Sequence, residues 1–585
     1  MKFWPEKRYG PARTGNLEIN NRKITTPNIA YIDTNRFRAP KFADIIITNK
    51  FRITEFPTIY FSEKTKKNIK EKNSDFISLV RLDEDYLISK NDNLEKKTIF
   101  IISNAKQLFN NPKKFLHLIV LLREKIGYQN IIYLPSTGTP QDLSLFSYLG
   151  IDLFDSTPAI VAARNNIIFF ENGCYDKYKI EEIPCNCPTC INVDKPPGDL
   201  DFKEILNHNY FELIKEIKKI RNAISMGEIR NLVEIRVRSS PHNTAILKNL
   251  DQIYYEYLEK RTPITNKGRI IATTKESCLR PEIIRFQRRL IDRYEKPSSA
   301  EVLLLLPCSA KKPYSSSKSH KMFRDQILRT ENPNVIHEVI ITSPIGLVPR
   351  ELEMVYPASS YDIPVTGHWE FYEREMINNL LSDYLRKNKY KKIISHLPDE
   401  IMEFLSPISK NIEKTCKGHP TSQDSLNCLG STLKVTVKNY KKVSFKTRAF
   451  EEMRSTALYQ FGEKLTLKLM ENSTIKGKYP YRKIFRDNKQ IGMITPERGL
   501  ISLTLPGAKM LIESNTNFVE IFDDFKLIGS IFAPGIKDAA KSIRIGDEVI
   551  IRRGNLVIAV GVAQMNGEEM MESTHGEAVK VRHKS

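Results

Sequence analysis

Five consecutive apolar residues, Val302 to Leu306, are followed directly by Pro307 and Cys308. A continuous apolar run of this length predicts a strand buried on both faces, and proline cannot continue the ladder because it lacks a backbone N–H. A strand covered on both faces belongs to an α/β fold. In such folds ligands bind in the crevice beyond the carboxyl ends of the strands. The residues after Leu306 are therefore predicted to line a site.

The first of these residues carries a nucleophile. Cys308 is followed by Lys311 and Lys312 and, further on, by His320. Nearby cations favour the thiolate, which is the reactive form of cysteine. The alternative is a small buried hydrophobe beside solvated lysines, with His320 capping a helix.

The spacing of the segment extends the argument. It reads Pro-Cys, three residues, Lys-Pro-Tyr, two residues, Ser, two residues, His, over Pro307 to His320. This pattern closely resembles the signature of archaeosine synthases, archaeal tRNA-modifying enzymes built on a tRNA-guanine transglycosylase scaffold. The resemblance implies an RNA substrate, tRNA that already carries 7-cyano-7-deazaguanine in its D-arm.

A nitrile is electrophilic but reacts slowly with neutral amines, so covalent catalysis would divide the addition into two easier steps. The hypothesis is that Cys308 attacks the nitrile to give a thioimidate, while Lys312 depresses the pKa of the thiol. His320 or Tyr314 would transfer the proton. Direct attack by the amine, with Cys308 structural, is the alternative.

The amine donor is not readable from the residues. The family is associated with lysine, whose adduct a separate enzyme finishes, and with glutamine, asparagine or ammonium. The product is therefore either archaeosine itself or an amidine-linked precursor. The resemblance also implies a homodimer or a complex with a second modification enzyme.

Composition restricts the class of protein. A chain of 585 residues is expected to contain several domains, and its net charge of +22 favours a polyanionic partner such as nucleic acid. No stretch is long and apolar enough to span a membrane, and the first residues lack the apolar core of a secretory signal. Eight cysteines, three of them within six residues, indicate a metal site in a reducing cytoplasm.

Those three cysteines are Cys185, Cys187 and Cys190, and His208 follows them. Three thiolates and one imidazole make a closed tetrahedral set, the structural type of zinc site. His242 is an alternative fourth ligand. A second cluster of possible ligands fits no common zinc module; its members are Cys416, His419 and Cys428.

Residues 1–262 alternate apolar runs with amphipathic stretches, as β/α folds do. The cysteine loop resembles the zinc loop of tRNA-guanine transglycosylases, and Gly150 to Asp155 resembles the strand that carries that family's nucleophilic aspartate, here Asp155. The family's Asp-Ser-Gly-Gly loop, expected between Asp75 and Phe115, is missing. We therefore expect a truncated, degenerate TIM-barrel-like domain in which Asp155 is vestigial and base exchange does not occur.

Residues 263–430 are predicted to form a Rossmann-like α/β core domain with the chemistry. A second strand, Val339 to Thr342, leads into a polar loop that runs from Ser343 to Trp369 and also resembles the archaeosine synthases. The candidate substrate-binding residues of this loop are Arg350, Glu351, Asp362 and Trp369. Arginine would bind phosphate or carboxylate, the acids would accept from a guanine-like edge, and tryptophan would stack on a flipped base. For each residue alone, a surface ion pair or a core position is the competing interpretation.

The remaining sequence is predicted to hold the RNA. Between Lys434 and Lys489 there are 15 lysines and arginines against 5 acidic residues, so we expect a small basic α/β domain over 431–503, with Lys434 to Lys438 as a strand. Residues 504–585 resemble a PUA domain, a compact β-barrel of RNA-modifying enzymes. The competing functions are base exchange by a transglycosylase and non-catalytic tRNA binding.

Overall fold

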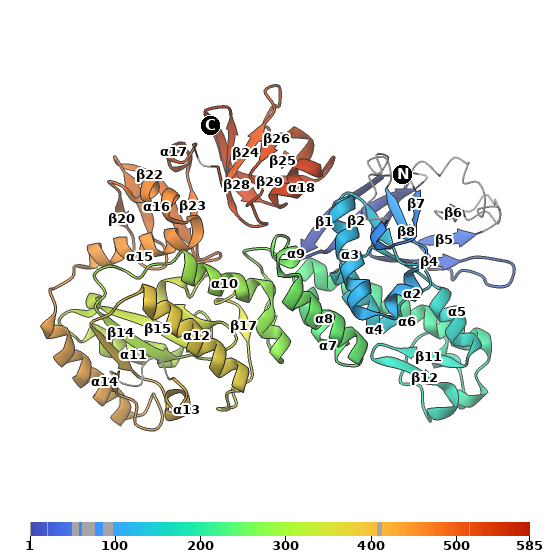
Figure 1. The fold of residues 1–585 in the computed structure, drawn as a ribbon, viewed down its shortest axis with the longest axis horizontal. Coiled ribbons are helices and arrows are strands. Elements are labelled where there is room, and N and C mark those ends of the chain that lie inside the picture. The colour runs from blue at the N-terminus through green and yellow to red at the C-terminus, as the bar shows by residue number, and fades with distance from the viewer. Residues whose placement is uncertain are drawn as a thin grey trace. The chain divides into compact units, whose positions relative to one another are not determined.

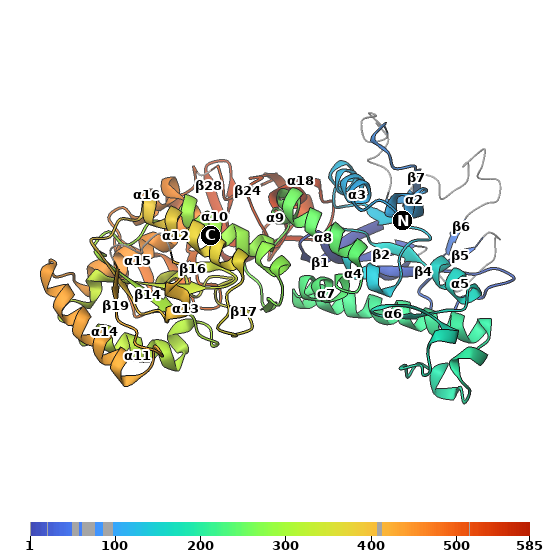
Figure 2. The same cartoon turned by 60° about the horizontal axis from the view of Figure 1, so that its bottom comes forward.

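The computed structural model forms two compact units (Figures 1 and 2). The first comprises residues 1–262 with 532–534 and 568–576, and the second comprises residues 263–531, 535–567 and 577–585. The structure describes residues 2–19, 21–48, 58–60, 77–85, 98–405, 412–513 and 515–585. Within these ranges no helix is both long enough and apolar enough to cross a bilayer.

The first unit is built on a seven-stranded parallel sheet in the order β6-β5-β4-β10-β9-β8-β7. Its strands are β4 Asn28–Ile32, β5 Ile45–Thr48, β6 Thr58–Tyr60, β7 Ile77–Val80, β8 Ile99–Ile102, β9 Ile131–Tyr133 and β10 Leu153–Asp155. The order follows the chain cyclically, as in a TIM barrel, with the first strand paired to the last. Among the described residues no pairing joins β6 to β7, so the ring is open there.

Helices and two small antiparallel sheets complete the unit. Its helices are α2 Ala105–Phe109, α3 Pro112–Ile126, α4 Pro140–Tyr148, α5 Thr157–Arg164, α6 Phe202–Met226, α7 Ile229–Val237, α8 Pro241–Ile253 and α9 Tyr255–Glu259. The small sheets contain β1 Lys2–Tyr9, β2 Ala12–Ile19 and β3 Arg22–Thr26, and the hairpin of β11 Ile167–Phe170 and β12 Gly173–Asp176. Helix α6 begins at a capping box, where Asp201 accepts from the backbone of Glu204 and the Glu204 side chain accepts in return.

The second unit contains a three-layer α/β domain. Its sheet has the order β16-β15-β14-β18-β19, parallel except for the edge strand β16. The strands are β14 Val302–Pro307, β15 Ile336–Thr342, β16 Gly346–Pro349, β18 Lys392–Ser395 and β19 Ile412–Lys414. The helices are α10 Pro281–Asp292, α11 Lys318–Leu328, α12 Phe371–Lys387, α13 Asp399–Met402 and α14 Gln423–Thr436. Two short strands, β13 Ile270–Ile271 and β17 Tyr361–Asp362, pair with each other.

Alternate residues of β14 enter two separate cores, which is why the strand is apolar throughout. Leu303 and Leu305 pack with α10 and α12, whereas Val302, Leu304 and Leu306 pack with α11 and α14. The buried strand predicted from the sequence is therefore present and ends at Pro307.

The carboxyl-terminal part of the second unit adds two more sheets. The basic segment forms α15 Phe445–Phe461, α16 Glu463–Met470 and a four-stranded antiparallel sheet of β20 Thr474–Lys476, β21 Lys483–Arg486, β22 Lys489–Thr495 and β23 Leu500–Leu503, followed by α17 Leu505–Met510. The last sheet has six strands: β24 Phe518–Ile521, β25 Ile531–Phe532, β26 Ile536–Ala539, β27 Glu548–Arg553, β28 Leu556–Ala563 and β29 Glu577–Lys584, with α18 Gly567–Glu572 before the final strand.

One sequence prediction is wrong. The segment from Lys434 to Lys438 is the end of α14 and a short 3-10 turn, not a strand. Leu426, Leu429 and Leu433 follow a helical spacing and pack against β14, so burial of this face overrides the alternating local pattern. The helix begins at Ser422, whose side chain accepts from the backbone of Ser425.

Candidate active site

Cys308 lies directly after β14, and Thr342 ends the neighbouring strand β15. The two strands are parallel, with Pro307 opposite Ile341, so the next residues, Cys308 and Thr342, emerge side by side at the carboxyl edge of the sheet. The Cys308 side chain is half-buried and shares no disulfide. The sulfur is therefore at the edge where this fold binds ligands.

Three hydroxyl groups form a connected chain beneath this sulfur. Thr342 ends the strand beside Cys308, and its hydroxyl donates to the carbonyl of Ser343 at 3.0 Å. The same hydroxyl bonds that of Tyr361, which lies 2.5 Å from the hydroxyl of Tyr314. The Nζ of Lys312 lies over the aromatic ring of Tyr361, 3.9 Å from the ring centroid. A thiol, an amine and three hydroxyl groups thus lie in one region, at the carboxyl edge of the sheet.

The electrostatics correct one prediction. Burial raises the pKa of the Cys308 thiol, although Thr342 and Lys312 both act to lower it. Burial lowers the pKa of Lys312, against the opposing effects of Cys308 and Asp362. Lys312 therefore acts in the predicted direction, but the net effect on the sulfur is opposite. Burial thus shifts the pKa of Cys308 toward the neutral thiol and that of Lys312 toward the neutral amine.

His320 is held at both ring nitrogens. Its Nε2 donates to the carbonyl of Pro307 at 3.0 Å, and its Nδ1 accepts from Arg350 at 2.8 Å. Burial, assisted by the charge of Arg350, lowers the pKa of His320 to about 3. The imidazole is therefore neutral and has no nitrogen left to move a proton at the reacting centre, contrary to the role predicted from the sequence.

The four candidate substrate-binding residues lie in different environments. Arg350 is engaged by Glu338 at 2.6 Å and Glu353 at 2.9 Å, and Glu351 accepts from Tyr294 at 2.6 Å. The side chains of Arg350 and Glu351 therefore form their hydrogen bonds within the fold. Asp362, half exposed beside Arg269 at 3.2 Å, and Trp369, half-buried against Phe404, lie on the segment that follows Tyr361.

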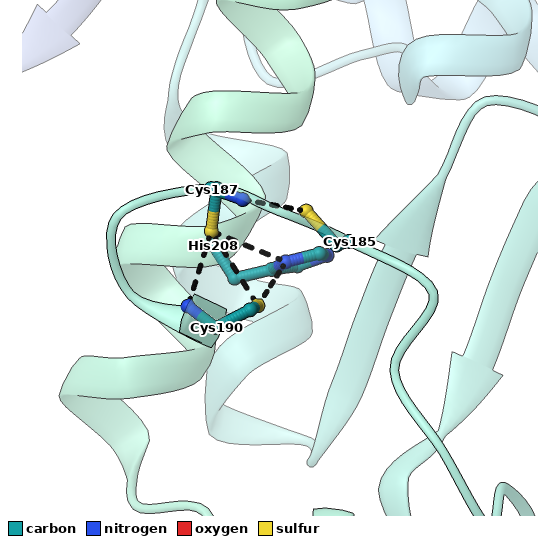
Figure 3. A group of neighbouring side chains, drawn as sticks. All are labelled: Cys185, Cys187, Cys190 and His208. Atoms are coloured by element: carbon teal, nitrogen blue, oxygen red, sulfur yellow. Dashed lines mark hydrogen bonds between the residues drawn. The ribbon is translucent and has the colours of Figure 1, made fainter. Parts of the chain in front are cut away.

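The cysteine loop and α6 bring four metal-ligand side chains together (Figure 3). One ligand atom from each of Cys185, Cys187, Cys190 and His208 lies within 4.8 Å of the other three. His208 directs Nδ1 toward the thiols, 3.2 Å from the sulfur of Cys190, while its Nε2 donates to the carbonyl of Phe169 at 2.8 Å. This second hydrogen bond fixes the tautomer and ring orientation, as is usual for a metal-binding histidine.

The alternative ligands do not join this cluster. His242 packs on Phe109 with ring centroids 4.5 Å apart. Among the described residues, the Cys3His group is the one cluster of suitable ligand atoms, and Cys416, His419 and Cys428 do not form a second.

Asp155 ends β10 at the carboxyl edge of the open barrel. Its carboxylate accepts from the hydroxyl of Tyr133 at 2.7 Å and from the backbone of Ser136 at 2.8 Å and Thr157 at 2.7 Å. These donors fix the loop after β9 and the start of α5. The sequence region in which the Asp-Ser-Gly-Gly loop is missing lies partly outside the described residues, including Asp75 and 86–97.

Comparison with known proteins identifies four family models along the chain. Their descriptions and matched residues are Queuine tRNA-ribosyltransferase, 88–242; Domain of unknown function (DUF5591), 283–433; Patch-forming domain C2 of tRNA-guanine transglycosylase, 451–516; and PUA domain, 526–584. The Cys3His cluster falls in the first model and Cys308 in the second.

Among full-length relatives, the archaeosine synthase subunit alpha of Methanosarcina acetivorans is 35% identical over 85% of this chain and 81% of its own length. The archaeosine synthase of Haloferax volcanii is 33% identical over 83% of this chain and 82% of its own. The chain belongs to the archaeosine synthase family. The tRNA-guanine(15) transglycosylase of Methanothermobacter thermautotrophicus is more distant, at 28% identity over 77% of this chain and 65% of its own length.

Archaeosine synthases are enzymes that modify tRNA, and the family assignment confirms the resemblance drawn from the Pro307 to His320 segment. The multidomain α/β architecture is confirmed as well: a transglycosylase half-barrel, an α/β domain, a C2 domain and a terminal PUA sheet.

Sequence reasoning missed two residues of this candidate site, Thr342 and Tyr361. Thr342 was available as the last residue of the strand beside β14, since parallel neighbours end at the same edge. Tyr361 had no such signal, because its approach depends on the pairing of β17 with β13.

Proposed function

We propose that this protein adds an amine to the nitrile of 7-cyano-7-deazaguanine in tRNA, and that Cys308 is the nucleophile. The observation that supports this most strongly is the position of the sulfur beside Lys312 and Thr342, at the carboxyl edge of the sheet. The family assignment supplies the tRNA substrate, and the PUA match adds an RNA-binding module.

In the first step the thiol proton passes to Lys312, whose pKa is lowered by burial. The sulfur forms a bond to the nitrile carbon, one carbon–nitrogen π pair moves to nitrogen, and Lys312 returns the proton there. The product is a thioimidate.

In the second step the amine attacks the same carbon. The carbon–sulfur bond breaks, its electron pair returns to sulfur, and the proton lost by the amine passes to the sulfur. The amidine contains all the atoms of the nitrile and the amine, and the Cys308 thiol is regenerated.

We propose further that the Cys3His cluster holds zinc. Three soft sulfur ligands and one imidazole with a fixed tautomer match a closed structural site. Such an ion would cross-link the loop of Cys185 to Cys190 to α6, far along the chain from Cys308, and contributes stability rather than chemistry.

Several finer assignments remain proposals. The proposed domains are 1–262, 263–430, 431–503 and 504–585. Asp362 and Trp369 are proposed to lie near the bound base. The protein acts in the cytoplasm as a homodimer or with a second modification enzyme. The donor is one of lysine, glutamine, asparagine or ammonium.

Mass spectrometry of nitrile-bearing tRNA tests the function. The tRNA is incubated with the protein and each donor in turn. The modified nucleoside gains the mass of lysine if lysine is the donor, and the mass of ammonia if glutamine, asparagine or ammonium supplies the nitrogen. Acid quenching before donor addition should trap tRNA on a peptide containing Cys308. No mass gain with any donor would reject the activity, and a mass gain that persists in Cys308→Ala would reject the thioimidate.

A further inference from the structure

The loop that carries Cys308 is fixed by a buried network at both of its ends. At the first end, the Nε2–H of His320 holds the carbonyl of Pro307, the residue directly before the sulfur. Arg350 in turn fixes His320 by donating to its Nδ1. His320 lies in the first turn of α11, where its backbone N–H donates to the side chain of Ser317, the residue that caps the helix.

At the second end, Glu353 is the central residue. One of its carboxylate oxygens accepts from the backbone N–H of Ser315 at 2.8 Å and from Arg350 at 2.9 Å. Glu353 is fully buried, so loss of Arg350 would leave its charge uncompensated. Arg350 thereby connects the two ends of the loop, from Pro307 to Ser315.

The other oxygen of Glu353 accepts from the hydroxyl of Tyr479 at 2.7 Å. Tyr479 lies far along the chain, between β20 and β21 of the basic C2 domain. The same connection carries Lys478, Tyr481 and Arg482, and the Tyr481 side chain is 58% exposed. An exposed aromatic among cations is a feature of surfaces that bind single-stranded nucleotides and RNA backbones.

We propose that Tyr479 couples docking of tRNA on the β20–β21 connection to the placement of Cys308, through Glu353, Arg350 and His320. These four are positioning residues, since none of them touches the reacting atoms. The proposal rests on the proposed function, because it takes tRNA as the molecule that docks and Cys308 as the nucleophile. It assigns Arg350 and His320 a role that the substrate-binding and proton-transfer predictions did not.

The network consists of discrete hydrogen bonds rather than general packing, which makes it separable by substitution. Tyr479→Phe removes one hydroxyl and keeps the ring. His320→Gln is able to retain the donor to Pro307, whereas His320→Asn is better placed to keep the acceptor for Arg350. Arg350→Lys keeps the charge but cannot bond Glu338, Glu353 and His320 together.

The experiment measures alkylation of Cys308 by iodoacetamide in the full-length protein, quantified by mass spectrometry of its peptide. Rates are taken with and without an unmodified tRNA transcript, which has no nitrile and so cannot react. In the parent protein the transcript should change the rate by about threefold or more, and in Tyr479→Phe the rate should be the same with and without RNA. Tyr481→Phe, which removes an exposed hydroxyl from the same connection, is the matched control and should keep the response.

Without RNA, Arg350→Lys and His320→Asn should change the alkylation rate by about tenfold, and His320→Gln should change it less. Far-ultraviolet circular dichroism and the thermal midpoint identify any variant that fails to fold. If the Arg350 and His320 variants do not fold, Tyr479→Phe alone tests the proposal. An unchanged RNA response in folded Tyr479→Phe would overturn the coupling. A response that disappears there, together with no mass gain on nitrile-bearing tRNA, would support the coupling while rejecting the proposed function.

Discussion

Asp155 and Cys308 occupy equivalent places in two different sheets, yet their surroundings differ completely. Each lies at the carboxyl edge of a parallel strand, β10 in the half-barrel and β14 in the second α/β domain. The carboxylate of Asp155 accepts hydrogen bonds from three donors within the half-barrel. Cys308 instead has a partly buried side chain beside an amine whose pKa is lowered. A residue at the edge of a sheet becomes a catalytic candidate only when its reactive atom is not already engaged.

The comparison also separates two uses of buried polar groups. Around Asp155 they fix the connection between a strand and a helix. Around Cys308 they fix a loop and leave its nucleophile available. The following predictions test this contrast, beginning with the largest expected effect.

Cys308→Ala should lower amidine formation on nitrile-bearing tRNA by about 10⁴-fold, because the covalent route is lost while tRNA binding is retained. Single-turnover mass spectrometry measures the rate, and filter binding measures the affinity. Cys428→Ser, a half-buried thiol on α14, is the control. Near-normal turnover in Cys308→Ala would return the sulfur to a structural role like that of Asp155.

Cys187→Ser should lower the free energy of unfolding of the half-barrel by more than ~5 kcal/mol, since a structural zinc site contributes its binding energy to folding. Elemental analysis should find one zinc per parent chain and less in the variant, and thermal unfolding should show the loss. Cys174→Ser, an exposed thiol on the neighbouring strand β12, should leave both unchanged. Equal zinc content in the two variants would contradict the assignment.

Lys312→Met should lower nitrile turnover at pH 7 by about 10²-fold, as expected for loss of a positioned base. Lys312 acts to lower the pKa of the Cys308 thiol, so its removal should raise that pKa further. The rate of Cys308 alkylation, which follows the thiolate fraction, should therefore rise only at higher pH than in the parent. Lys311→Met is the exposed neighbour for comparison, and an identical alkylation profile in both variants would be evidence against a role for Lys312.

Asp155→Asn should have the smallest effect, destabilising the half-barrel by ~1–3 kcal/mol with amidine formation intact. The amide group replaces one acceptor oxygen by donors, so at least one of the three bonds is lost. Denaturant unfolding gives the stability, and Asp194→Asn, an exposed carboxylate of the same unit, is the control. Incorporation of labelled guanine into tRNA by the parent but not by Asp155→Asn would show that the aspartate is catalytic after all.

The sequence was most informative where one residue type admits few environments. Five apolar residues before a proline predicted a strand covered on both faces, and three close cysteines with a following histidine predicted that these side chains come together. Local spacing was sufficient for the Cys3His cluster and for the motif that led to the family. It was insufficient for Lys434 to Lys438. The alternating pattern there predicted a strand, but the segment ends α14 because the leucine face of that helix is buried.

What the tertiary structure decided is which side chains were still available. Sequence alone placed Arg350, Glu351 and His320 near the site because they follow strands, but it could not reveal their partners. Those partners are far along the chain, as Tyr479 is from Glu353, and a hydrogen bond forms only when folding brings donor and acceptor together. The amino acid sequence therefore determined the chemistry the chain carries, and three-dimensional contacts determined which groups are left to perform it.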